Sequence, residues 1–301
     1  MLKEMHPKRF SLGLITSSGS LGLLFPPSLT LILYAIVAQI SIDLLFLAGI
    51  IPGLMMIVIL GLYSLNKSRA FKTDSYQFNA REAISAIRES VWEVPLPFII
   101  IAGIYSGSFT VPEAAVVTVV YIIFISVWIN NDLNLQSDIP RLMKESMILA
   151  GTIIIILGTA MGFTSYLVDQ QIPTQVLDFI NQHIDDKLTF LIILNVFLLT
   201  AGCLMDIFSA IIIIAPLVVP IAQSYGIDMV HLGIIFLTNL EIGYSTPPIG
   251  INLFIESSRF KEPVVTLYRA VLPFLGIRII GLFLITYSPA ISLFIPNLFS
   301  Q

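Results

Sequence analysis

The chain has 301 residues, of which 56% are hydrophobic and 11% are charged, and its formal net charge at pH 7 is −4. A soluble globular domain carries about 25% charged residues, so this composition excludes a protein whose surface is solvated mainly by water. Several apolar stretches reach the roughly 20 residues that a membrane-crossing helix needs. Because lipid offers no partner for unpaired backbone groups, we expect an all-α integral membrane protein.

Apolar segments alternate with polar links along the chain. In order, we expect a broken helix over 12–40, spans over 44–65, 94–109, 111–129 and 146–168, a re-entrant hairpin over 188–222 with its tip near 205–209, a second broken helix over 229–258, a last span over 264–287 and a short apolar tail over 289–299. Polar links are expected over 66–89 and 130–145. The asparagines and the glutamate at membrane depth indicate helix–helix hydrogen bonds at Asn195, Asn239, Glu241 and Asn252.

Two parts of the chain resemble each other at one constant offset. Each has an apolar half, a Gly-x-x-x-Pro-Pro motif, a second apolar half, a short connector and a span with an early proline. The matching positions are Gly22 with Gly243, Pro26-Pro27 with Pro247-Pro248, and Pro52 with Pro273. This shared layout predicts an internal repeat.

The basic residues predict that the two copies are inverted. Lys8 and Arg9 precede copy one and the basic link 66–89 follows it, whereas in copy two Arg259 and Lys261 lie in the connector. Cytoplasmic loops carry the excess of Lys and Arg, so the copies cross the membrane in opposite senses. We therefore divide the chain into the remainder of a first repeat (1–65), a basic cytoplasmic loop with connecting helices (66–145) and a second repeat (146–301).

The paired prolines predict that a helix unwinds at two matching places. Proline removes a backbone donor and pushes the preceding residue out of the helical region. Freed carbonyls can bind a cation, and broken helices in matching positions of inverted halves are typical of a secondary-transport site near the midplane. The alternative is a proline kink whose backbone groups are satisfied by a neighbouring helix.

Asp206 is an acidic residue inside an apolar segment. Such residues are costly in lipid and are usually functional. A cap at the hairpin tip explains the same residue without a ligand, so both interpretations stay open. The sequence contains no phosphate loop, nucleophile motif or redox cysteine pair, and its three histidines are isolated. We therefore predict neither an enzyme nor ATP-driven transport.

Four segments resemble the large permease subunit of TRAP (tripartite ATP-independent periplasmic) transporters. They are residues 18–53, 103–115, 203–254, which contains LEIGYSTPPIGINLF, and 267–275. The resemblance implies an inverted-repeat, elevator-type secondary transporter of the bacterial inner membrane. It implies Na⁺-coupled uptake of small organic acids, either dicarboxylates or sialic-acid-like acids.

The resemblance also implies partners and a site. The partners are a small membrane subunit and a periplasmic substrate-binding protein besides the lipid bilayer; we expect no nucleic acid, and no cofactor other than the coupling Na⁺. One Na⁺ is implied at Gly202, Gly243, Thr246 and Ile249, and another at Gly22, Phe25 and Pro27. Substrate is implied near Ser20, Gly22, Asp206, Ser245 and Thr246.

The chain differs from the family's pattern at its start. The family's subunit has a first hairpin with a Ser-rich tip ahead of the first broken helix, whereas here copy one begins almost directly with that helix. We therefore expect a fragment, the product of a split gene or a decayed copy. Two other functions stay open: an anion permease that uses no binding protein, and a non-transporting membrane scaffold.

Overall fold

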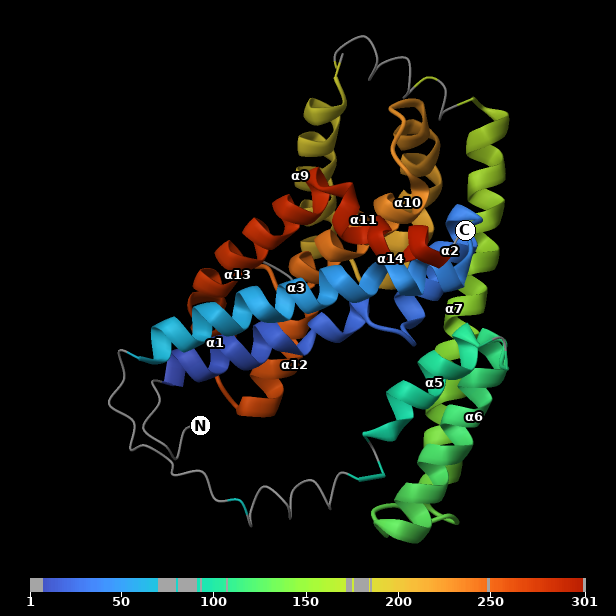
Figure 1. Cartoon of the computed structure of the whole chain (residues 1–301), viewed down its shortest axis with the longest axis vertical. Helices are drawn as coiled ribbons and strands as arrows, with labels where there is room; N and C mark the ends of the chain where they lie inside the picture. Colours follow the sequence, from blue (N-terminus) through green and yellow to red (C-terminus); the bar gives the residue numbers. More distant parts are fainter. Residues whose placement is uncertain are drawn as a thin grey trace. The chain divides into compact units, whose positions relative to one another are not determined.

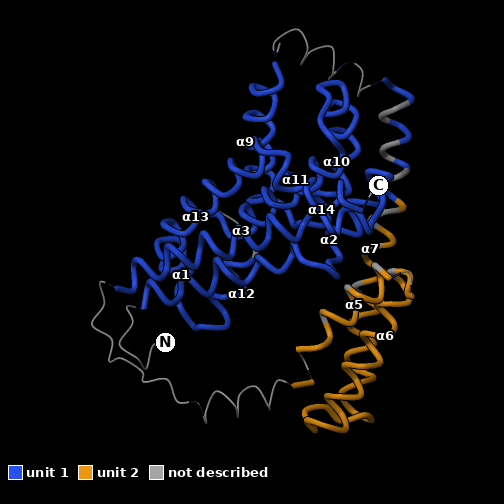
Figure 2. The backbone as a smooth tube through the Cα atoms, viewed as in Figure 1, with its two compact units in different colours: residues 1–74, 159–301 blue, residues 75–158 orange. Residues whose placement is uncertain are grey.

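The computed structural model describes residues 8–69, 94–106, 108–171, 186–247 and 250–299, together with the isolated positions 80, 91, 92, 175 and 184. Over these residues the regular structure is entirely helical, as predicted (Figure 1). The chain divides into two compact units, residues 1–74 with 159–301 and residues 75–158 (Figure 2). The predicted link 66–89 lies largely outside the described residues.

The first broken helix consists of α1 (Lys8–Gly19), the 3₁₀ turn η2 (Leu21–Leu24) and α2 (Leu29–Ala38). Phe25, directly before the two prolines, is extended at φ −101° and ψ 140°, as expected for a residue that precedes proline. The part up to Leu24 and the part from Leu29 are bent by 46° relative to each other. We refer to residues 21–28, between the end of α1 and the start of α2, as the first break. The sequence prediction of a broken helix here is confirmed.

Unit 2 contains α5 (Pro95–Tyr105), α6 (Val111–Phe124) and the π-helical turn η3 (Ile125–Ile129). Thr110 and Glu113 form a capping box at the start of α6. Helix α7 (Asp138–Asp169) covers the predicted span 146–168 but begins inside the predicted link 130–145. The start was missed because the first turns of α7 are rich in charged residues.

Helices α9 (Lys187–Leu204) and α10 (Ile207–Ser224) form the predicted helical hairpin. The ring of Phe190 near the start of α9 stacks on Tyr225, which directly follows α10, with a centroid distance of 4.5 Å. The open ends are therefore adjacent, and the chain reverses at Met205 and Asp206, where the tip was predicted. The re-entrant course of this hairpin stays a prediction.

An aspartate directly precedes the first residue of each of α9, α10 and α11. Asp186, Asp206 and Asp228 accept hydrogen bonds from backbone N–H groups of the first turn of their helices. Such caps satisfy donors that have no intrahelical partner. Hydrogen bonds from Thr189 hold the pKa of the exposed Asp186 carboxyl below its usual range.

The second broken helix is at the centre of unit 1. Helix α11 (Met229–Tyr244) is buried at every position from His231 to Gly243. It packs against α9, α10, α2, α3 and α13. The second break covers residues 245–250, of which 248 and 249 lie outside the described residues, and α12 (Ile251–Phe260) follows it.

Three further helices of unit 1 match predicted apolar segments. Helices α3 (Ile42–Ser68) and α13 (Val264–Tyr287) each contain one proline, Pro52 and Pro273, as the repeat predicts. Helix α14 (Pro289–Phe299) packs on α3. Within the described residues, 5 helices are long and apolar enough to cross a membrane, or up to 6 when the bent pair is counted as one span. The chain is accordingly a multi-pass membrane protein.

Candidate ion and substrate site at the two helix breaks

The ends of α1 and α11, which lead into the two helix breaks, meet in the interior of unit 1. The hydroxyl oxygen of Ser20, which follows α1, lies 3.5 Å from the hydroxyl oxygen of Ser245, which follows α11. Both serines are buried. The structure thus brings together two of the residues for which the sequence analysis implied substrate contact.

The backbone of the second break is tightened by short-range hydrogen bonds. The Thr246 N–H donates to the Gly243 carbonyl at 2.8 Å, and the Gly250 N–H donates to the Thr246 carbonyl at 3.1 Å. Each carbonyl oxygen has two lone pairs, so Gly243 and Thr246 keep acceptor capacity. The Thr246 hydroxyl donates to the Ile242 carbonyl at 2.7 Å, which leaves its oxygen able to accept. Ile249 lies outside the described residues.

The hairpin touches the second broken helix where two glycines meet. A Cβ atom added to Gly243 would lie 2.7 Å from the Cα atom of Gly202, so Gly243 has no room for a side chain; a Cβ atom on Gly202 would lie 3.0 Å from the Cα atom of Leu240, which is a tight contact. Both glycines lie in the last turn of their helices, α9 and α11. Carbonyls of a last helical turn lack intrahelical partners, and this end carries partial negative charge. Two such ends meeting in a buried place favour a cation.

The first break is more open than the second. The Phe25 N–H donates to the Gly22 carbonyl at 3.1 Å, and a Cβ atom on Gly22 would meet no atom within 4 Å. Pro27 is exposed. Within the described residues, no hydrogen bond joins Gly22, Phe25 or Pro27 to the group formed by Gly202, Gly243 and Thr246.

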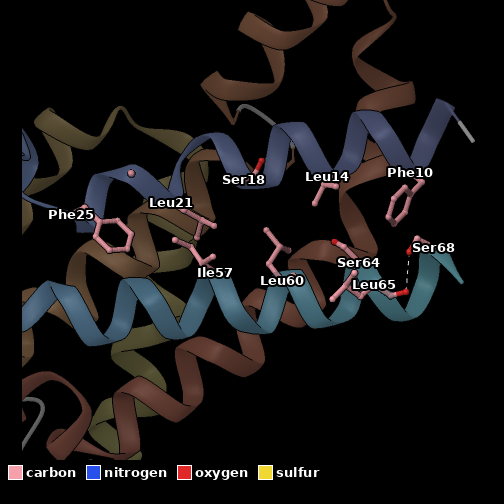
Figure 3. Close-up of a pocket in the computed structure, with 12 residues that line it drawn as sticks. Phe10, Leu14, Ser18, Leu21, Phe25, Ile57, Leu60, Ser64, Leu65 and Ser68 are labelled. Carbon is pink, nitrogen blue, oxygen red and sulfur yellow. Dashed lines mark hydrogen bonds between the residues drawn. The ribbon is translucent and has the colours of Figure 1, made fainter. Parts of the chain in front are cut away.

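An apolar groove runs from the first break along α1 and α3. Its volume is about 640 Å³. Figure 3 shows Leu14, Ser18 and Leu21 on one side of the groove and Ile57 and Leu60 of α3 on the other. Gly22 and Phe25 also line it, so the first break opens onto this groove.

Asp206 caps the start of α10. Its Oδ1 atom accepts a hydrogen bond from the Ser209 N–H at 3.0 Å, and the residue is half-buried. This is the position that the cap interpretation requires. A contact with substrate stays a prediction.

The sequence analysis missed a buried ion pair beside the breaks. Arg278 Nη2 of α13 donates to Glu241 Oε1 of α11 at 2.6 Å, and the two side chains are 1% and 0% exposed. Arg278 Nη2 also donates to the Ser20 hydroxyl oxygen at 3.2 Å. Glu241 had been predicted to make a helix–helix hydrogen bond, and it does so by accepting from Arg278 between α11 and α13. An arginine inside the apolar span 264–287 was the available signal, because charges at membrane depth are rare.

The buried asparagines make the helix–helix hydrogen bonds that were predicted. Asn239 Nδ2 donates to Asn195 Oδ1 at 2.6 Å, and Asn195 Nδ2 donates to the Thr286 hydroxyl at 3.3 Å. These bonds join α11, α9 and α13 away from the breaks. Asn252 Nδ2 donates to the Thr16 carbonyl at 3.0 Å and so ties α12 to α1.

Comparison with known protein families places the chain in one of them. Residues 1–291 match the family described as the tripartite ATP-independent periplasmic transporter, DctM component. The chain belongs to this family. It is a TRAP large permease, and the predictions of a transport protein and of no enzyme are confirmed by that membership.

Curated relatives of this DctM-family chain are named for different substrates. It is 38% identical over 298 residues to the C4-dicarboxylate TRAP transporter large permease protein DctM of Pseudomonas aeruginosa, covering 99% of this chain and 70% of that relative. It is 35% identical over 295 residues to the sialic acid TRAP transporter large permease protein SiaM of Vibrio cholerae, covering 96% of this chain and 68% of that relative. It is 33% identical over 299 residues to the isethionate TRAP transporter permease protein DctMQ of Oleidesulfovibrio alaskensis, covering 98% of this chain and 46% of that relative.

Proposed function

We propose that this DctM-family chain is a permease subunit for Na⁺-coupled uptake of small organic acids across the bacterial inner membrane. C4-dicarboxylates and sialic acids are the proposed substrate classes, because relatives that are 38% and 35% identical are named for them. The proposed mode of transport is an elevator-like movement of the element that carries both breaks.

One observation carries the proposal of cation coupling: the last turns of α9 and α11 meet at Gly202 and Gly243. Two partly negative helix ends with acceptor oxygens suit a small hard cation that binds oxygen. The proposed ligands are the carbonyls of Gly202, Gly243, Thr246 and Ile249, with the Thr246 hydroxyl in addition. A second Na⁺ is proposed at Gly22, Phe25 and Pro27 of the first break.

The organic acid is proposed to bind between the two breaks. Ser20 and Ser245 offer adjacent hydroxyl groups there. Helix α12 begins directly after the second break, and no side chain caps its first turn. Free N–H groups at a helix start attract carboxylates. Thr246 and Asp206 complete the proposed substrate contacts.

Two protein partners are proposed alongside the lipid bilayer. The family is tripartite and periplasmic by its description, which supports a periplasmic binding protein that delivers the substrate. The isethionate relative is a DctMQ permease, and this chain covers 46% of it. That relative supports a small membrane subunit as the second partner.

The test is uptake by proteoliposomes that contain the chain, its small subunit and its binding protein. Radiolabelled C4-dicarboxylate or sialic acid is offered under an inward Na⁺ gradient or an equal K⁺ gradient. We expect uptake only with Na⁺. Equal uptake under both gradients contradicts cation coupling, and uptake without the binding protein supports the independent anion permease instead.

Thr246→Val tests the proposed cation site, and Thr238→Val is its matched control. Both hydroxyls donate to the carbonyl four residues earlier, each at 2.7 Å, but Thr238 lies in the middle of α11. We expect T246V to raise the Na⁺ concentration for half-maximal uptake at least tenfold, a loss of about 1.4 kcal/mol of binding free energy. T238V should leave that concentration unchanged; equal effects of both variants would remove Thr246 from the site.

A further inference from the structure

Three buried side chains join the two helix breaks through one charged contact. Arg278 Nη2 lies 2.6 Å from Glu241 Oε1 and 3.2 Å from the Ser20 hydroxyl, and that hydroxyl lies 3.3 Å from Glu241 Oε1. The three residues come from the end of α1, from α11 and from α13. We refer to Ser20, Glu241 and Arg278 as the clasp.

The clasp lies where the two copies of the repeat meet. Ser20 and Glu241 are separated by 221 positions, the same offset that relates Gly22 to Gly243. Equivalent residues of two copies touch each other only near the axis that relates the copies. Each of the two residues also lies two positions before the glycine of its own Gly-x-x-x-Pro-Pro motif, so the clasp contacts the chain just before both breaks.

The charge of the clasp is supplied by one copy alone. At the same offset, Arg278 corresponds to Ile57 of α3, which is 45% exposed and lines the apolar groove. A single guanidinium therefore contacts the residues that precede both breaks. A displacement of the first break relative to the second would therefore break the hydrogen bonds that Ser20 makes with both charged side chains.

The clasp lies next to the proposed substrate region, because Ser20 is also close to Ser245. Ser20 is 3.5 Å from the Ser245 hydroxyl, and Asn252 Nδ2 is 3.5 Å from the same hydroxyl. Glu241 Oε2 and two nitrogens of Arg278, Nε and Nη1, are buried without a hydrogen-bond partner among the described residues. A buried pair that leaves polar atoms unsatisfied contributes little net stability. The geometry of the clasp instead points to a role in positioning the two breaks.

We propose that Arg278 and Glu241 are positioning residues that set the two proposed cation sites at a fixed separation and so make Na⁺ binding cooperative. This inference rests on the proposed Na⁺-coupled function. Neither residue is assigned as a ligand. The pair acts on the first break through the contact with Ser20, and on the second break through Glu241 itself, which lies in α11 just before that break.

The experiment is a Na⁺ titration of the thermal unfolding of the purified full chain in detergent, with choline chloride keeping the ionic strength constant. The variants are R278M, which removes the charge, and the double variant E241Q/R278M, which leaves a neutral pair of similar shape. Thr286→Val is the matched control, because it removes a buried hydroxyl from the Asn195 network, away from the breaks.

For the wild-type chain we expect Na⁺ to raise the unfolding temperature with a Hill coefficient above one. R278M and E241Q/R278M should raise the Na⁺ midpoint at least tenfold and lower the Hill coefficient toward one. T286V should lower the unfolding temperature and keep both Na⁺ parameters. R278K keeps the charge without the forked geometry, so it should give intermediate values and remains informative where R278M does not fold.

The outcomes separate this inference from the proposed function. A wild-type Na⁺ response that R278M, E241Q/R278M and R278K all retain within twofold overturns the clasp alone. A wild-type chain with no response to Na⁺ overturns Na⁺ coupling, and the clasp with it. Equal changes of the Na⁺ midpoint in T286V and R278M would show that loss of stability is the cause, and would also overturn positioning.

Discussion

Asp206 illustrates how one side chain can satisfy a local requirement next to a functional region. Its carboxylate caps α10 by accepting the Ser209 N–H. It also lies at the hairpin tip, four residues after the Gly202 contact with α11. A cap needs an acceptor oxygen but no negative charge, whereas binding of an ion or a charged substrate responds to the charge itself. Replacing Asp206 by asparagine keeps the acceptor oxygen and removes the charge, so it separates the two roles.

We predict that Asp206→Asn keeps the stability of the chain and that Asp206→Ala lowers it by about 0.5–2 kcal/mol, because Asn caps a helix as well as Asp and Ala does not. Thermal unfolding of both variants in detergent measures this difference. Equal stability of the two variants would contradict the capping role. Uptake that is lost in D206N, with the fold intact, would assign a function to the charge.

At the scale of elements, the two breaks differ in what covers them. Gly243 of the second Gly-x-x-x-Pro-Pro motif lies against Gly202 of the hairpin, so the backbones of α9 and α11 are in contact. Gly22, the equivalent glycine of the first motif, is exposed and borders the apolar groove. The same motif therefore has two environments within one chain.

This difference predicts that glycine-to-alanine substitutions at the two positions have unequal effects on stability. Gly243→Ala places a Cβ atom 2.7 Å from Gly202, and overpacking of this kind costs about 1–3 kcal/mol. Gly22→Ala meets open space and should cost nothing measurable. Unfolding temperatures of the two variants provide the measurement; a tolerated G243A would show that α9 and α11 can separate without loss.

For the whole molecule, the sequence predicted the helices better than the contacts. The last span was predicted at its observed bounds, and both broken helices were found, because proline and apolar length act locally. The start of α7 was missed because its charged first turns resemble a polar link. Ser20 and Ser245 were placed in one site through the resemblance, but the pairing of Glu241 with Arg278 was not predicted. A contact between α11 and α13 leaves no local pattern in a single sequence.

The clasp also has an electrical consequence for the whole molecule. Moving one elementary charge through a potential of 100 mV changes the energy by about 2.3 kcal/mol. Glu241 and Arg278 have opposite charges and lie within 2.6 Å of each other, so an element that carries both adds no net charge to its own movement. Its unloaded return step should therefore be insensitive to voltage as far as these residues are concerned. Glu241→Gln should introduce a voltage-dependent transient current on solid-supported membranes, and an unchanged current would mean that the pair does not move through the field.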